Sequence, residues 1–174
     1  MIVILAGVSG SGKTTVGLLL AARLGWPFAD GDSFHPAANI AKMTAGLPLT
    51  DADRWPWLAA IGAWIDERAA AGGSAVVACS ALKRAYRDVL RKDRPQVRIV
   101  FLTIDRDAGL ARLQARRGHF FSAGLLGTQL AAVEPPSPGE GVLVLDAAQS
   151  PGQLVDAIMS GLGLRQPPAP AGGS

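Results

Sequence analysis

The chain has 174 residues, of which 49% are hydrophobic, and its formal net charge at pH 7 is +3. This length predicts a single domain with a sizeable core. No apolar run reaches the ~18 residues of a membrane span, no charged leader precedes the first apolar run, and the basic residues form no cluster. We therefore expect a cytoplasmic protein that binds neither membranes nor nucleic acids, and the single cysteine, Cys79, excludes an internal disulfide framework.

Short apolar runs alternate with helix-like segments along the chain. The apolar runs predict strands at residues 2–6, 28–29, 74–79, 97–104 and 142–145. Helices are predicted at residues 15–24, 37–45, 54–71, 84–92, 107–116 and 151–162, with one more ending near residue 133 after an irregular stretch. This alternation predicts an α/β fold with a parallel sheet covered on both faces. We expect one domain over residues 1–164, and a disordered tail over 165–174, which is rich in Pro, Ala and Gly.

A glycine-rich loop follows the first strand and opens the first helix. It comprises Gly7, Val8, Ser9, Gly10, Ser11, Gly12, Lys13 and Thr14, which fits the P-loop pattern G-x-x-x-x-G-K-[ST]. Its backbone N–H groups and the helix N-terminus favour an anion. We expect it to bind a nucleoside triphosphate together with Thr15, Lys13 reaching the outer phosphates and Thr14 ligating Mg²⁺. The alternative is a glycine-rich turn that matches by chance.

Polar residues also follow the second and third strands, at the edge where parallel sheets bind ligands. Asp30 and Asp32 end the second strand. We assign Asp32 to the acceptor hydroxyl as general base and Asp30 to the water shell of the metal, although the two roles could be exchanged. Ser80, Lys83 and Arg87 follow the third strand, and the two cations suit an anionic acceptor. The alternative for the carboxylates is a solvated turn.

The segment after the second strand offers further ligands for an acceptor. His35 could hydrogen-bond a sugar hydroxyl or only cap the next helix, where Asn39 and Lys42 share one face. Arg54 could hold a carboxylate in bidentate fashion or pair with Asp51 within the chain. Both alternatives remain open for both residues.

An arginine-rich segment lies far from the P-loop in the sequence. Arg112, Arg116, Arg117 and His119 fall in or beside a lid that we place at about residues 117–135. Such a lid would exclude water, with Arg112 and Arg116 on the nucleotide, Arg116 stabilising the transferred phosphoryl group, and His119 near the acceptor. A solvated basic helix is the alternative reading.

Taken in this order, the motifs resemble those of the gluconate kinases, within the shikimate-kinase-like group of P-loop kinases. The resemblance covers residues 2–162, and its most particular stretches are Asp30–Leu58 and Cys79–Arg91. It implies a three-layer αβα P-loop kinase fold with five parallel strands and a small helical lid. It also implies the ATP-dependent phosphorylation of D-gluconate to 6-phospho-D-gluconate, and a homodimer. A related small-molecule kinase such as shikimate kinase, or an ATP-binding switch without turnover, is the alternative.

Overall fold

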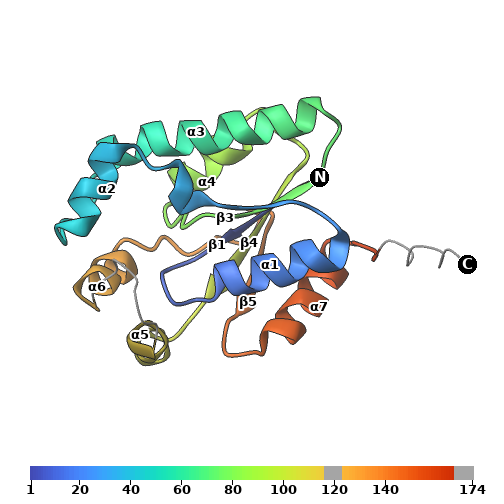
Figure 1. The fold of residues 1–174 in the computed structure, drawn as a ribbon. Coiled ribbons are helices and arrows are strands. Elements are labelled where there is room, and N and C mark those ends of the chain that lie inside the picture. The colour runs from blue at the N-terminus through green and yellow to red at the C-terminus, as the bar shows by residue number, and fades with distance from the viewer. Residues whose placement is uncertain (116–122, 167–174) are drawn as a thin grey trace, which may run out of the picture.

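The computed structural model describes residues 1–115 and 123–166, and the side chains of these residues except those of 113–115 and 123–125. Its centre is a sheet of five parallel strands in the order β2-β3-β1-β4-β5 (Figure 1). The strands are β1 (Ile2–Ala6), β2 (Phe28–Asp30), β3 (Ala75–Ala78), β4 (Val97–Thr103) and β5 (Val142–Asp146). β1 pairs with β3 on one side and with β4 on the other, and all its residues are buried. Strands covered on both faces are apolar throughout, which is why this run lacks polar alternation.

Helices cover both faces of the sheet and confirm the three-layer αβα fold. On one face α1 (Lys13–Leu24) packs with α7 (Pro151–Gly161), and on the other α3 (Asp51–Ala70) packs with α4 (Arg84–Arg91). The remaining helices are α2 (Ala37–Thr44), α5 (Arg106–Ala115) and α6 (Ala123–Ala131), and a short 3₁₀ turn, η1, spans Gly31–Phe34. These three helices lie at the end of the sheet where β1 runs into α1 (Figure 1).

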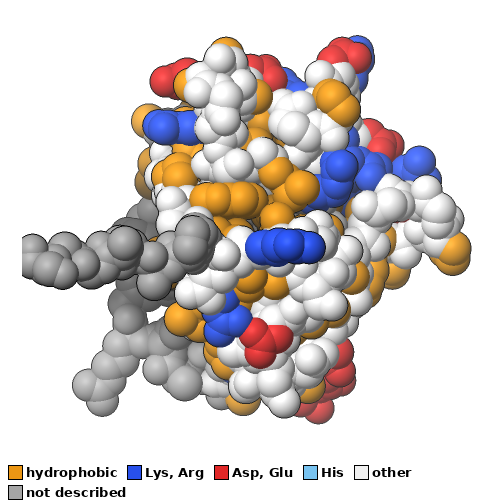
Figure 2. All heavy atoms as spheres, turned by 90° about the vertical axis from the view of Figure 1, so that its right-hand side faces the viewer, with side chains coloured by type: hydrophobic (Ala, Val, Ile, Leu, Met, Phe, Trp, Pro, Cys, Tyr) orange, Lys and Arg blue, Asp and Glu red, His pale blue; other side chains and the backbone are white. Residues whose placement is uncertain are grey.

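The opposite end of the molecule has a mixed surface. On the face seen in Figure 2, charged side chains of both signs lie around hydrophobic ones. No helix among the described residues is both long enough and apolar enough to span a bilayer. Cys79 is buried in the core, as a small apolar residue would be.

Helix α3 begins at Asp51, three residues before the predicted start at Arg54. Thr50 caps it, since its hydroxyl accepts from the N–H of Asp53 while Asp53 accepts from the N–H of Thr50. This reciprocal capping box is readable in the sequence as Thr-x-x-Asp, although the predicted helix starts only at Arg54. The earlier start puts Asp51 and Arg54 one helical turn apart on the same face.

Two other predictions concern segments that the structure describes only in part. The irregular stretch predicted before residue 127 is helical from Ala123, where α6 begins. The lid predicted for 117–135 lies partly outside the described residues, as does most of the predicted tail.

Candidate active site

The P-loop lies at a point where the strand order reverses. In the sheet, β2 and β3 lie on one side of β1, and β4 and β5 lie on the other. Open α/β sheets bind ligands at such a point. Glycine is required at Gly7, which has φ +134°, because a Cβ there would come within 2.4 Å of the carbonyl oxygen of Leu102. Nζ of Lys13 donates to the carbonyl of Val8 at 3.0 Å. The lysine is therefore folded back over the loop that it serves.

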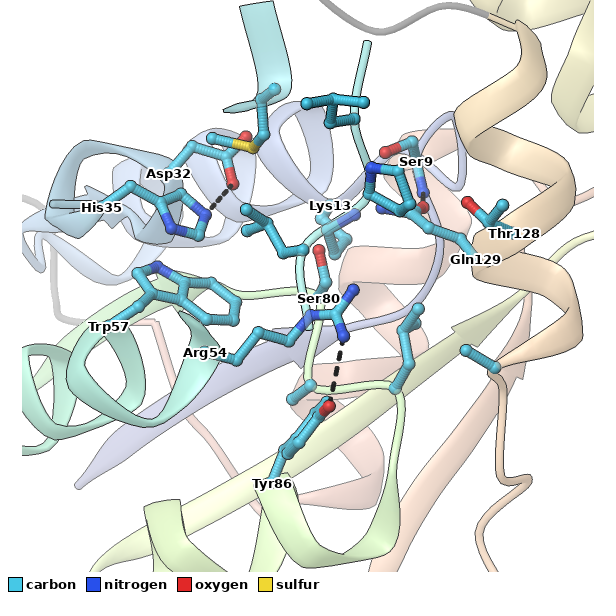
Figure 3. Close-up of a pocket in the computed structure, with 17 residues that line it drawn as sticks. Ser9, Lys13, Asp32, His35, Arg54, Trp57, Ser80, Tyr86, Thr128 and Gln129 are labelled. Carbon is cyan, nitrogen blue, oxygen red and sulfur yellow. Dashed lines mark hydrogen bonds and ion pairs between the residues drawn. The ribbon is translucent and has the colours of Figure 1, made fainter. Parts of the chain in front are cut away.

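Two pockets flank the P-loop. The first, called here the Asp32 pocket, is shown in Figure 3. Its polar lining residues are Ser9, Lys13, Asp32, His35, Arg54, Ser80, Tyr86, Thr128 and Gln129. The second, called here the Arg112 groove, is lined by Gly10, Ser11, Gly12, Thr15, Val16, Arg112, Ala147, Gln149, Pro151 and Leu154. The P-loop thus contributes residues to both pockets.

The two carboxylates after β2 have different surroundings. Oδ2 of Asp30 accepts a hydrogen bond from the Thr14 hydroxyl at 3.2 Å, and its Oδ1 accepts from the N–H of Asp32 at 3.1 Å. Asp32 itself lines the Asp32 pocket with its side chain 68% exposed. One carboxylate is therefore tied to the end of the P-loop, and the other faces the space in front of Lys13 (Figure 3).

His35 stands behind Asp32 in a fixed orientation. Its ring stacks on Trp57 with centroids 4.4 Å apart, and its Nε2 lies 4.0 Å from Oδ1 of Asp32. The Asn39 side-chain nitrogen lies 3.3 Å from Nδ1 of His35 and donates to the carbonyl of Asp53 at 2.8 Å. Because an amide nitrogen only donates, we assign the ring proton to Nε2, which faces Asp32.

Burial, aided by the nearby charge of Arg54, lowers the pKa of His35 to about 4, so the ring is neutral at pH 7. Asn39 is itself buried. We had predicted that it binds the acceptor, but the structure places it behind His35, outside the lining of the pocket. Its role in the structure is to orient the imidazole.

Arg54 and Lys83, both predicted acceptor ligands, have different positions. Arg54 lines the Asp32 pocket, where its Nη1 donates to the Tyr86 hydroxyl at 3.3 Å and lies 3.6 Å from Oδ1 of Asp51. The pairing with Asp51 is thus present, and Arg54 also lines the pocket, where binding of an acceptor carboxylate stays a prediction. Nζ of Lys83 instead donates to both carboxylate oxygens of Asp51 at 2.8 Å, in a neighbouring hollow.

The structure corrects the prediction that Arg87 binds the acceptor. Its side chain is fully buried and forms a fork-like ion pair with Glu140, whose side chain is also fully buried. Nη1 of Arg87 donates to the carbonyls of Leu82 and Glu134 at 2.9 and 3.0 Å. The guanidinium therefore joins the loop after β3 to the loop before β5 and has no access to the pocket. Ser80, at the start of the first of these loops, does line the pocket.

In the Arg112 groove, Arg112 donates to the carbonyl of Ala147 at 2.7 Å. This contact holds Arg112, which we predict to bind the nucleotide, beside the P-loop. Arg116 and His119, predicted to act from the lid, lie outside the described residues, as does Arg117.

Several residues that line the pocket were not predicted from the sequence. The N–H of Ser9 donates to Oε1 of Gln129 at 2.8 Å, which ties the P-loop to α6. These residues are 120 positions apart, so no local pattern announces the contact. Tyr86 and Trp57 carry the polar and stacking contacts of the wall, and neither is among the predicted site residues.

Comparison with known proteins gives consistent matches. Residues 9–121 match the family model for shikimate kinase (SKI). A gluconokinase of Gluconobacter oxydans is 49% identical over 90% of this chain and 88% of its own length. The thermosensitive gluconokinase of Escherichia coli is 46% identical over 79% of this chain and 73% of its own length.

Two solved structures are similar in both sequence and fold. A sugar kinase from a Janibacter species has a TM-score of 0.88 at 47% identity, covering 94% of each chain. A gluconokinase from Sinorhizobium meliloti has a TM-score of 0.82 at 46% identity, covering 92% of this chain and 90% of its own. These similarities extend over more than nine-tenths of this chain. The chain therefore belongs to the gluconokinase family, within the shikimate-kinase-like P-loop kinases.

Proposed function

We propose that this protein transfers the γ-phosphoryl group of ATP to the 6-hydroxyl of D-gluconate, giving 6-phospho-D-gluconate and ADP. One observation supports this most directly: a carboxylate, the P-loop lysine and an arginine, from three separate segments, line one pocket beside the P-loop. Asp32 can accept the proton of the acceptor hydroxyl, and Lys13 and Arg54 are opposite in charge to the transferred phosphate and the acceptor carboxylate. The names of the similar gluconokinases support the same assignment.

The two pockets suggest how the substrates are divided. We infer that the nucleoside of ATP lies in the Arg112 groove and that its phosphates follow the P-loop toward Lys13. Gluconate then lies in the Asp32 pocket, with its 6-hydroxyl toward Asp32 and its carboxylate toward Arg54. In this arrangement Ser9 and Lys13, which line the acceptor side, are closest to the phosphoryl group in transfer.

The residues at the P-loop are suited to hold Mg²⁺. Thr14 and Asp30 offer a hydroxyl and a carboxylate 3.2 Å apart, and oxygen ligands of this kind are what Mg²⁺ prefers. The described residues hold no group of three metal-ligating side chains, so phosphate and water would complete the coordination. When bound, the cation would offset the charge of the phosphates.

We assign the proton transfer to Asp32. The carboxylate takes the proton of the 6-hydroxyl while the hydroxyl oxygen bonds to the γ-phosphorus and the bond to the ADP oxygen breaks. Nε2–H of His35 faces this carboxylate at 4.0 Å, beyond direct hydrogen-bond distance. Lys13 stabilises negative charge on the transferred group.

Further elements of the proposal come from the family resemblance. Arg116 and His119 would complete the site from the lid, and the active form would be a homodimer. A cytoplasmic location likewise remains a prediction from the sequence.

An ATP-coupled assay with gluconate, shikimate and neutral sugars tests the function. We expect kcat/KM for gluconate to exceed that for shikimate or glucose by roughly 10²-fold or more, because a site built around a charged group rejects acceptors that lack it or misplace it. Turnover with shikimate but not gluconate would overturn the acceptor assignment. ATP binding without turnover on any acceptor would indicate a switch.

A further inference from the structure

Four polar side chains form one connected cluster at the edge of the Asp32 pocket. Asp51 and Arg54 come from the first turn of α3, and Lys83 and Tyr86 from the start of α4, which packs against α3. Lys83 donates to both oxygens of Asp51 at 2.8 Å, and the Tyr86 hydroxyl donates to one of them at 2.6 Å. The hydroxyl oxygen in turn accepts from Arg54 at 3.3 Å. Tyr86 therefore lies between the arginine and the carboxylate.

Asp51 competes with any anionic ligand for the charge of Arg54. The two side chains are three residues apart on one helix face, a spacing at which opposite charges attract and Arg can form a two-pronged bond with a carboxylate. Here the two side chains form an ion pair whose nearest atoms are 3.6 Å apart, which is longer than a hydrogen bond, while Lys83 and Tyr86 hydrogen-bond the oxygens of Asp51. These hydrogen bonds also lower the pKa of Asp51, so it is ionised at neutral pH. Arg54 consequently keeps its donors directed into the pocket (Figure 3).

Packing fixes the hydroxyl that makes this separation. Tyr86 is 2% exposed, and its ring meets Trp55 edge-on at 5.4 Å between centroids. The positive groups of Lys83 and Arg54 lie 5.7 and 5.8 Å from the centre of the same ring. The ring cannot rotate away from either cation without breaking these contacts.

We propose that Tyr86 is a positioning residue for acceptor recognition: with Lys83 it limits Asp51 to a loose ion pair with Arg54 and prevents a direct hydrogen-bonded one, and it holds the guanidinium where the acceptor carboxylate binds. The proposal rests on the proposed phosphorylation of gluconate. It gives Lys83 an indirect role in binding, through Asp51, in place of the direct contact predicted from the sequence.

The first test is Tyr86→Phe, which removes the hydroxyl and keeps the ring. Asp51 then bonds Arg54 directly, so we expect KM for gluconate to rise about tenfold, the effect of losing one hydrogen bond to a charged group. KM for ATP and kcat should stay within about twofold. Arg84→Gln, on an exposed side chain of the same helix, is the matched control and should leave all three values unchanged.

The second test is a rescue by Asp51→Asn, which removes the competing negative charge. In the Tyr86→Phe background it should return most of the lost affinity for gluconate. Lys83→Met tests the same idea without touching the aromatic ring: KM for gluconate should rise, and Asp51→Asn should again restore it. Thermal unfolding of each variant checks that the fold is kept.

The outcomes separate this proposal from simpler ones. If Tyr86 or Lys83 contacts gluconate directly, Asp51→Asn restores nothing, and the proposal is overturned. An unchanged KM in Tyr86→Phe and Lys83→Met overturns it as well. A parent protein that does not phosphorylate gluconate overturns this proposal together with the proposed function, whereas an active parent with these results overturns this one alone.

Discussion

Two charged regions of the molecule each contain an arginine that the sequence predicts to bind the acceptor. Arg54, at the Asp32 pocket, keeps 22% of its side chain exposed and shares its nearest carboxylate with Lys83 and Tyr86. Arg87 is fully buried and paired with Glu140, which is equally buried. Arg87 thus forms two direct hydrogen bonds to its carboxylate, whereas Arg54 is only loosely paired with a carboxylate that it shares with two other donors, and we propose that its remaining donors bind the acceptor. The partners of a charge therefore decide its role more than its position after a strand.

The energetics of the two regions should differ in the same way. Removing one partner of a buried pair leaves an uncompensated charge in the core, which costs about 3–5 kcal/mol. Exposed charges contribute little to folding because water screens them. Substitutions in the Asp32 pocket should change catalysis, and those at the buried pair should change stability.

The largest effect on rate should come from the exposed carboxylate of the pocket. Asp32→Asn removes the proposed base while keeping the side-chain shape, so kcat should fall by roughly 10²–10⁴-fold. ATP affinity and the melting temperature should stay close to those of the parent. Steady-state kinetics and a binding titration check this, and a near-normal kcat would mean that Asp32 is not the base.

Arg87→Met should have the largest effect on folding. The unfolding free energy should fall by about 3–5 kcal/mol, because Glu140 stays buried without its partner. Denaturant unfolding measures this loss, and the double variant Arg87→Met with Glu140→Leu should recover much of it. If Arg87→Met instead raises KM for gluconate in a fully stable protein, the buried pair is part of the site after all.

Arg54→Met should show the opposite pattern. KM for gluconate should rise roughly 10- to 100-fold from the loss of charge-assisted hydrogen bonds, with little change in unfolding free energy. Arg54→Lys keeps the charge without the fork and should be intermediate. If KM for ATP rises as much as KM for gluconate, Arg54 is not specific to the acceptor, and the contrast with Arg87 fails.

The smallest effect concerns pH and stability. The pKa of His35 is about 4 in the folded protein and near 6.5 when unfolded, so the unfolded chain binds more protons between these values. The stability contributed by the neutral ring is present above pH 6.5 and is lost as the pH falls toward 4. Urea unfolding at pH 7 and pH 5 should show a smaller decrease for His35→Gln than for the parent. Identical decreases would mean that His35 is not buried in its neutral form.

The sequence by itself determined the P-loop, the order of strands and helices, and the placement of Asp30 and Asp32 at the end of a strand, because apolar periodicity and glycine spacing are local. The sheet rule then brought Asp32 to the same edge as Lys13. Even the early start of α3 was readable, in its capping box.

Only the tertiary structure decided which polar side chains reach the ligand. Glu140 is 53 residues from Arg87, Asp51 is 32 from Lys83, and Gln129 is 120 from Ser9. Local pattern is silent about such partners, because a charge or amide is satisfied by whatever the packed chain brings within about 3 Å of it. For this reason the order of strands and helices in the sequence predicted where the pocket lies, whereas the packing of α3, α4 and α6 determined which residues line it.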